Sequence, residues 1–500
     1  MRAHLIPAAL AALTVTPLRA AAQQDHAHAQ KLGTVRFPVS CSAPASAEAQ
    51  RGLALLHHMT YEAAAEAFAG AVKADPSCAM GYWGQAMSYI HPLWTDPPGP
   101  EKYARGAALL DEALRRSKAG GWERTWIEAT RAYFAAGRGA REAPNLQAFA
   151  RGWESAHAAR PDDPEAAAFH ALTLLPTADP ADKTHPVRRR AGAVAESVLV
   201  RVPDHPGAHH YVIHAYDVPE LAGDAVRVAH AYSSVAPEVP HALHMPSHIF
   251  VRTGDWENVI EWNRRSAEAA LARPVGDSLS LHYLHALDYL AYGYLQQGRD
   301  AEARQVAATL AAIRQPMQAE AAVPYALAAV PARLALERQD WKAAAALEAR
   351  VPADFPWDRF PAMEALTHFA IALGAAHTGD QARAQRAIAR LSELRTAVAP
   401  ASPYWAKQIE IQRIAAEAWL EFAAGRKDEA LAAMRQAAEL EASTDKNPIT
   451  PGELLPATEL LGDMLLEMKR PKEALAAYQA ALQRSPGRRN ALRGVERAGG

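Results

Sequence analysis

The sequence predicts an all-α protein built from repeated pairs of helices, a solenoid. Half of its 500 residues are apolar but only 7% are aromatic, and alanine supplies much of the apolar half, which suits closely packed helices better than a large sheet. No alternating run of Val, Ile, Thr and aromatic residues long enough for a strand stands out. At this length one compact core would be unusual, which favours a repeat array or several domains.

The first 22 residues have the pattern of a secretory signal peptide. Arg2 precedes a mostly apolar stretch at 5–18, and Ala20, Ala21 and Ala22 supply the small residues of a cleavage site. We therefore expect a periplasmic or secreted protein in which 1–22 is the signal peptide and 23–44 is a flexible leader. The apolar stretch is too short to cross a bilayer, and no longer one follows, so we expect no membrane span.

Charge and cysteine content narrow the classes of partner and fold. The chain has 53 Lys and Arg against 55 Asp and Glu, so it carries no charge surplus that would favour nucleic acid as a partner. Cys41 and Cys78 are its only cysteines, which excludes a disulfide scaffold and leaves open one bridge between them in an oxidising compartment.

Repeats that close on a proline recur along the chain. Counting back from Pro76, small and aromatic residues stand at Ala71, Phe68, Ala64, Tyr61 and Gly52. Counting back from Pro486, the corresponding residues are Ala481, Tyr478, Ala474 and Gly462. Small residues at these offsets let two helices approach closely, while the aromatic ring fills the gap between neighbouring pairs. The pattern resembles the tetratricopeptide repeat (TPR) family, which implies a TPR-like superhelix with a concave binding face.

The repeats divide the chain into three regions. The best matches are 45–78 and 455–488, and two more units, 206–239 and 240–273, follow one another at a 34-residue period. Later turn markers are 40 to 46 residues apart, which predicts longer helix pairs, and they are Gly298, Gln339, Gly379, Gly425 and Lys469. We therefore expect N-terminal helical repeats at 45–205, His-rich central repeats at 206–292 and C-terminal helical repeats at 293–500.

Histidines are concentrated in the central repeats. Ten of the 21 histidines fall between residues 205 and 285. His210 and His214 are four residues apart, as are His244 and His248, so each pair would share one face of a helix. The two pairs are 34 residues apart, and in the TPR family their positions face the concave groove, so the resemblance implies that the four imidazoles converge. Segments 203–214 and 241–250 also look like those of exported bacterial TPR-like proteins with a His-rich central region.

This pattern predicts a transition-metal site. Its candidate ligands are His210, His214, His244, His248, His241, His282, His285, His205 and Asp288. Imidazoles without thiolates suit zinc, copper or iron, and they do not suit calcium or magnesium. Pro246 either kinks the helix between His244 and His248 or begins a new helix, and a new helix would leave His241 and His244 on a loop. Isolated histidines such as His57 and His58 are expected to be surface or hydrogen-bonded core residues.

Three functions remain open at this point. In the one we favour, the exported TPR-like protein binds a transition metal on its concave face, and the groove receives a peptide or a small molecule. In the second, the cluster is the active site of a zinc hydrolase or of a copper or iron oxidoreductase, with a catalytic group among Asp217, Asp288, Tyr211, Tyr216, Tyr283 and Tyr292. In the third, the protein is a metal-free scaffold whose groove binds a peptide and whose histidines are a polar lining. The cluster also has a structural alternative, in which buried histidines donate to backbone carbonyls and hold adjacent helices together without a metal. Common peptidase, redox, hydrolase and nucleotide-binding motifs are absent.

Overall fold

Regular structure in the chain is helical. The computed structural model describes residues 30–94, 97–135 and 142–499, so the expected signal peptide and the first part of the leader lie outside the described residues. Within these ranges the only β-type pairings are two isolated bridges, which join Val275 to Ser278 and Leu279 to Met317. The all-α prediction is confirmed.

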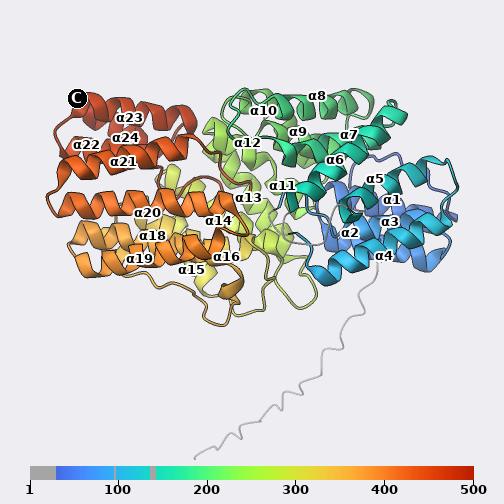
Figure 1. The fold of residues 1–500 in the computed structure, drawn as a ribbon, viewed down its shortest axis with the longest axis horizontal. Coiled ribbons are helices and arrows are strands. Elements are labelled where there is room, and N and C mark those ends of the chain that lie inside the picture. Colours follow the sequence, from blue (N-terminus) through green and yellow to red (C-terminus); the bar gives the residue numbers. More distant parts are fainter. Residues whose placement is uncertain (1–29, 95–96, 136–141, 500) are drawn as a thin grey trace, which may run out of the picture. The chain divides into compact units, whose positions relative to one another are not determined.

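The N-terminal region forms helix pairs in which each helix packs on the next, as α1 does on α2, α3 on α4 and α5 on α6 (Figure 1). Its helices are α1 Ala43–His57, α2 Tyr61–Ala74, α3 Ala79–Met87, α4 Pro100–Arg116, α5 Trp122–Ala135, α6 Glu142–Ala159, α7 Pro164–Leu174, the short η1 Leu175–Thr177 and α8 Pro186–Arg201. The predicted unit at 45–78 corresponds to α1 and α2.

The central region holds the two 34-residue units. They correspond to α9 with α10 and to α11 and α12 with α13. The helices are α9 Pro206–Tyr216, α10 Ala222–Val235, α11 Pro240–His244, α12 Pro246–Thr253, α13 Trp256–Leu271 and α14 Leu281–Gln296. Because α9 contacts both α7 and α12, and α11 contacts α14, the first helices of neighbouring units lie side by side.

The C-terminal region continues the array with longer helices. They are α15 Asp300–Ala311, α16 Ala322–Leu336, α17 Trp341–Ala345, the short η2 Trp357–Arg359, α18 Pro361–Thr378, α19 Gln381–Val398, α20 Pro403–Ala423, α21 Lys427–Ala442, α22 Ala457–Glu467, α23 Pro471–Arg484 and α24 Arg489–Gly499. Alternate helices touch from α14 through α16, α18, α20 and α22 to α24. This is the packing of a TPR-like helical-repeat solenoid.

The repeat residues pack as their spacing predicts. A Cβ at Gly84 would stand 2.2 Å from the Phe68 ring, and one at Gly462 would stand 2.6 Å from the Tyr478 ring. Each aromatic ring therefore fills space that only a glycine on the neighbouring helix leaves open. All five later turn markers have positive φ, as residues that end a helix often do.

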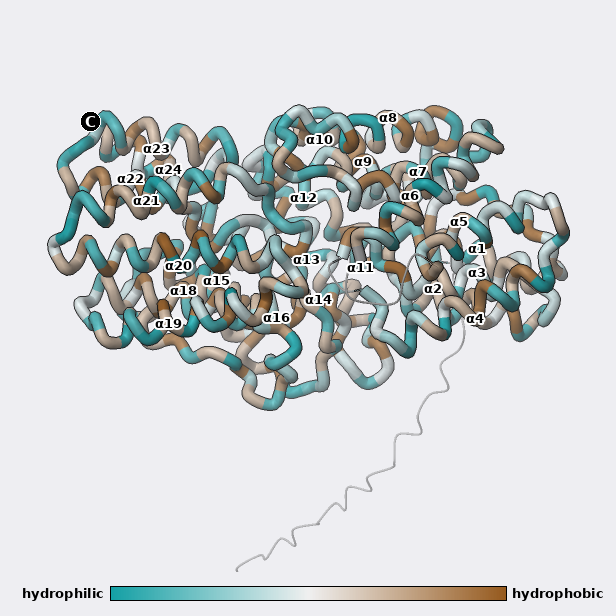
Figure 2. The backbone as a smooth tube through the Cα atoms, in the orientation of Figure 1, coloured by the Kyte–Doolittle hydropathy of each residue, from teal (hydrophilic) through white to brown (hydrophobic). Residues whose placement is uncertain are grey.

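Apolar side chains form two main cores that meet at the central repeats. One runs from the leader to α14, and the other runs from α13 to α24. Apolar and polar residues alternate along the helices (Figure 2), and no helix in the described residues combines the length and the apolarity that a bilayer crossing needs.

The leader is ordered from Lys31 onward, so the predicted flexibility of 23–44 is wrong for that part, while 23–29 lie outside the described residues. Phe37 is 2% exposed and packs against Trp83 and Trp126. The Arg36 N–H donates to the buried carboxylate of Glu165 over 2.6 Å. The segment is therefore held both through the Phe37 side chain and through the Arg36 backbone N–H.

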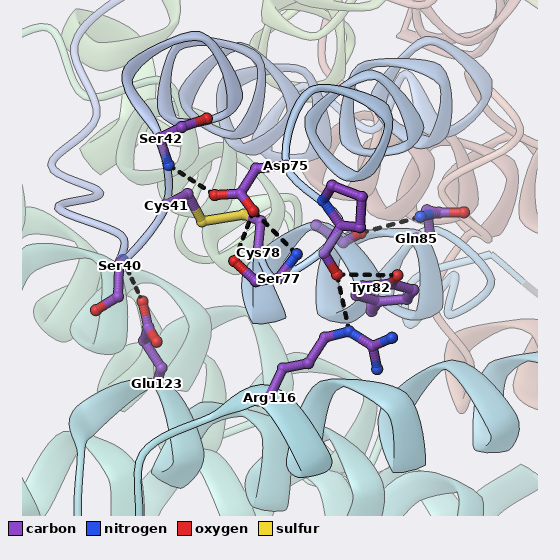
Figure 3. The surroundings of a disulfide bond; sticks show 12 residues. Ser40, Cys41, Ser42, Asp75, Ser77, Cys78, Tyr82, Gln85, Arg116 and Glu123 are labelled. Carbon is purple, nitrogen blue, oxygen red and sulfur yellow. Dashed lines mark hydrogen bonds between the residues drawn. A yellow bond between two sulfur atoms is a disulfide. The ribbon is translucent and has the colours of Figure 1, made fainter.

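A disulfide joins the end of the leader to the first helix pair. Cys41 and Cys78 are bonded (Figure 3), in agreement with one of the two states that the sequence left open. Beside the bridge, the Ser42 N–H donates to Asp75 over 2.8 Å and the Ser40 N–H donates to Glu123 over 2.6 Å. The bridge and these bonds together fix the leader on the N-terminal repeats.

Candidate metal centre

Six of the predicted ligands form two groups of three imidazoles. The first group comprises His210 and His214 of α9 and His241 of α11, and the second comprises His244 of α11, His248 of α12 and His285 of α14. In each group, one ring nitrogen from every histidine lies within 4.8 Å of the other two. All six side chains are buried.

The two groups adjoin one another. Ring centres are 5.5 Å apart between His214 and His248 and 6.0 Å apart between His241 and His244. His282 belongs to neither group, but its ring centre is 5.0 Å from that of His241. We call this assembly the histidine cluster; it consists of His210, His214, His241, His244, His248, His282 and His285.

Pro246 does not separate His244 from His248. It is the first residue of α12, but Met245 before it keeps helical dihedral angles, φ −52° and ψ −38°. The turn therefore continues from α11 into α12, and the Nε2 atoms of His244 and His248 lie 3.0 Å apart. The alternative that placed His241 and His244 on a loop is wrong, because the proline removes one N–H donor without ending the helical turn.

Hydrogen bonds fix which nitrogens carry protons in the second group. The Asn263 amide Nδ2 donates to the Val259 carbonyl over 2.7 Å, so the Asn263 Oδ1 must be the atom that accepts from His244 Nδ1, also over 2.7 Å. The Nδ1 of His248 donates to the Asp217 carboxylate over 3.0 Å. Both rings therefore carry their proton on Nδ1, and both Nε2 lone pairs point at each other.

The first group repeats this arrangement in part. His210 Nδ1 donates to the His57 carbonyl over 2.7 Å, which leaves the His210 Nε2 lone pair 3.1 Å from His214 Nε2. His241 is 4% exposed, and both of its ring nitrogens are buried without a hydrogen-bond partner. Buried polar atoms rarely lack partners in proteins, so both nitrogens of His241 are available to an ion or another ligand.

The imidazoles are neutral at neutral pH. Burial lowers the pKa of His214, His241, His244 and His285 well below the usual value, and neighbouring imidazoles lower it further. Burial also lowers the pKa of His210 to about 3. Between His244 and His248, which both carry their proton on Nδ1, the facing Nε2 lone pairs repel each other unless a cation lies between them.

Asp217, at the end of α9, orients His248 from outside the cluster. Its carboxylate also accepts from Arg252 over 2.9 Å and from Lys446 over 2.8 Å. Although burial raises the pKa of Asp217, Lys446 and Arg252 bring it well below the ordinary range. Carboxylates that hold the second nitrogen of a metal-binding histidine are common around metal sites.

Two predicted ligands lie outside both groups. Asp288 forms an ion pair with Arg333 at 3.1 Å, because α14 turns this side chain toward α16. His205 lies with His57 and Glu165 in a third group. The prediction that Asp288 and His205 belong to the central site is therefore wrong. Asp288 binds Arg333, 45 residues away in the sequence, and His205 binds Glu165, 40 residues away.

The third group is a closed hydrogen-bond network. His205 Nδ1 accepts from the Ala208 N–H, so its Nε2 donates to Glu165 over 3.1 Å. His57 Nε2 also donates to Glu165, over 2.8 Å, while the Tyr211 hydroxyl donates to His57 Nδ1. Protons thus occupy the positions where a metal would bind, and His57 is the hydrogen-bonded core residue that the sequence suggested.

Several candidates for a catalytic role are engaged elsewhere. Tyr211 is bonded to His57 as described, and the Tyr292 hydroxyl accepts from Arg488 over 2.8 Å. Three residues beside the cluster were not predicted from the sequence: Asn263, Lys446 and Tyr289. The ring centre of Tyr289 is 4.5 Å from that of His244. Tyr289 follows His285 by four residues, so the spacing could have predicted that both lie on one helical face. Nothing in the sequence connects Lys446 with Asp217.

A pocket opens over the histidine cluster. Its histidine lining comprises His214, His241, His248, His282 and His285. Because these include two members of each three-histidine group, the pocket gives access to both groups at once.

Comparisons with known proteins found matches among solved structures only. No protein-family model matches the chain, and no curated protein matches it. Among solved structures, the chain is similar to the P58(IPK) TPR domain, with 12% identity over 91% of this chain and 98% of that chain and a TM-score of 0.22. It is also similar to a human IFIT1 dimer with PPP-AAAA, with 13% identity over 94% and 98% and a TM-score of 0.42, and to yeast Tom70, with 10% identity over 92% and 88% and a TM-score of 0.29. At these values the likeness carries no argument about function, and the assignment of a TPR-like fold rests on the helix pairing within this chain.

Proposed function

We propose that this TPR-like protein binds zinc, copper or iron through the histidine cluster, with one ion in each three-histidine group. The observation that carries the proposal is the pair of Nε2 atoms of His244 and His248, which face each other at 3.0 Å while both Nδ1 atoms donate elsewhere. Two imidazoles bound to one tetrahedral ion at about 2.0–2.1 Å would have their nitrogens about 3.3 Å apart. The spacing is therefore close to that of a chelating pair.

The contrast with the third group supports the proposal. His57 and His205 both direct an N–H at Glu165, so that group is complete without an ion. In the histidine cluster, lone pairs face one another, and His241 has two unpartnered nitrogens. Asn263 and Asp217 hold the remote nitrogens of His244 and His248, as residues around metal sites commonly do.

Imidazole-only ligand sets favour late first-row transition metals. Three neutral histidines leave further coordination positions for water or a ligand, as in catalytic zinc sites. We further propose that the protein works in the periplasm or outside the cell. The signal-peptide pattern at 1–22 and the bond between Cys41 and Cys78 support this location, since disulfides persist in oxidising compartments.

Titration of the metal-free protein with cobalt(II) tests the metal proposal. Cobalt(II) is a coloured substitute for zinc, and we expect saturable visible absorption bands from wild type. His248→Ala and His210→Ala should each weaken these bands sharply, because each removes one ligand from one group. His230→Ala is the matched control, since His230 is an exposed residue of α10 in the same part of the sequence. Equal cobalt binding by all four proteins would contradict the proposal.

A further inference from the structure

The pocket over the histidine cluster is placed to bring one ligand to both metal positions. His214 and His241 from the first group line it, as do His248 and His285 from the second group. The rings of His214 and His248 are 5.5 Å apart between centres. A single donor atom at the base of this pocket therefore lies within reach of ions held by either group.

The charge balance of the site calls for an anion. Six neutral imidazoles leave the positive charge of the bound ions uncompensated. The nearest carboxylate, Asp217, accepts from Lys446 and Arg252 at 2.8 and 2.9 Å, so its charge is already matched. Apart from the histidines, Glu320 is the one ionisable residue among the described residues that line the pocket, and it is already engaged within the protein. An anionic ligand head would compensate the charge of the bound ions.

Apart from Asn447 and Glu320, the pocket lining outside the histidines is apolar. It includes Leu93, Trp94, Leu281, Pro448 and Ile449. The Trp94 ring approaches His241 and His282 edge-on, with ring centres 6.1 and 6.4 Å apart. A charged body would lose its hydration against these apolar side chains, whereas an apolar body would be stabilised there.

His282 is placed to contact the ligand's head. It lines the pocket, it is 9% exposed, and its Nδ1 is buried without a partner. Because His282 belongs to neither three-histidine group, its ring is free to donate a hydrogen bond to an oxygen bound at the ions.

On the footing of the proposed metal site, we infer that this pocket binds a small molecule with one anionic oxygen head and an apolar body. The head binds the metal ions beside His282, and the body lies against Trp94, Pro448 and Ile449. Carboxylates and phenolates with a ring or a short hydrocarbon chain belong to this class.

Three probes added to the cobalt-loaded protein test the inference. Benzoate has both head and body, acetate has the head alone, and benzyl alcohol has a similar body with a neutral head. We expect benzoate to perturb the cobalt bands with an affinity about tenfold or more above that of acetate, because a buried ring adds apolar contact area. Benzyl alcohol should bind about tenfold or more weaker than benzoate.

Variants locate the binding to the pocket. Ile449→Asp adds a like charge beside the ligand, so it should weaken benzoate binding about tenfold while cobalt content stays unchanged. The control is Leu271→Asp, at a residue that is 49% exposed and outside the pocket lining. It should change neither benzoate binding nor cobalt content. Normal cobalt loading with benzoate no tighter than acetate would overturn this inference and leave the metal site standing. Absence of cobalt bands before any probe is added would overturn both.

Discussion

Acid should destabilise this protein through its buried neutral histidines, and His58 allows one of them to be measured alone. His58 is fully buried, with Nε2 donating to the Leu32 carbonyl over 3.1 Å and Nδ1 accepting from the Tyr232 hydroxyl over 2.8 Å. Burial lowers its pKa to about 3, and the Leu32 bond offsets this in part. In the unfolded chain this histidine has a pKa of about 6.5. Between pH 6.5 and 3 the unfolded chain therefore binds a proton at His58, and the folded protein does not.

The sign and size follow from this linkage. The contribution of His58 to stability is present above about pH 6.5, and it is lost progressively as the pH falls toward 3. Between pH 7 and pH 5 the loss is about 2 kcal/mol for this one group. His58→Gln keeps an N–H donor and does not titrate, so this variant should not show that loss of stability.

Urea unfolding followed by circular dichroism measures the effect. Wild type and His58→Gln are compared metal-free at pH 7 and at pH 5, so that the other histidines contribute equally to both. Wild type should lose about 2 kcal/mol more than the variant on acidification, and His230→Gln, at an exposed position, should behave as wild type. If wild type and His58→Gln lose the same stability, the reasoning about buried neutral histidines is refuted.

Three other predictions follow from named contacts. Asn263→Leu removes the acceptor that orients His244, so metal affinity should fall about 10- to 100-fold by titration, whereas Asn258→Ala on the same helix should leave it unchanged. Glu165→Gln disturbs the closed network with His57 and His205, so stability should fall by about 1–3 kcal/mol while elemental analysis finds unaltered metal content. Replacing Cys41 and Cys78 together by serine opens a bridge between residues 37 apart and should lower the unfolding free energy by about 4 kcal/mol; in urea melts, a double variant as stable as wild type would argue against this.

The repeat architecture could be predicted because its determinants are local. Gly52 and Phe68 stand at fixed offsets within one helix pair, so the spacing alone indicates their contact. The same reasoning identified His210 with His214 and His244 with His248, since residues four apart share a helical face even across Pro246.

Contacts between residues that are distant in sequence could not be predicted in this way. Asp288 follows His285 by three residues, a spacing that places both on one helical face, but the structure pairs Asp288 with Arg333 of α16. His205 stands one residue before α9 and contacts Glu165 of α7. Lys446 reaches Asp217 from 229 residues away. These contacts depend on how distant repeats pack, and no local pattern in the sequence carries that information.

Elemental analysis of the protein tests the central claim most directly. The mature chain should be purified without a histidine tag and without added metal, and its content measured by inductively coupled plasma mass spectrometry. The account predicts zinc, copper or iron in stoichiometric amount, approaching two ions per chain, and a clear loss in His248→Ala. A wild-type protein that holds no transition metal and takes none up on titration would contradict it.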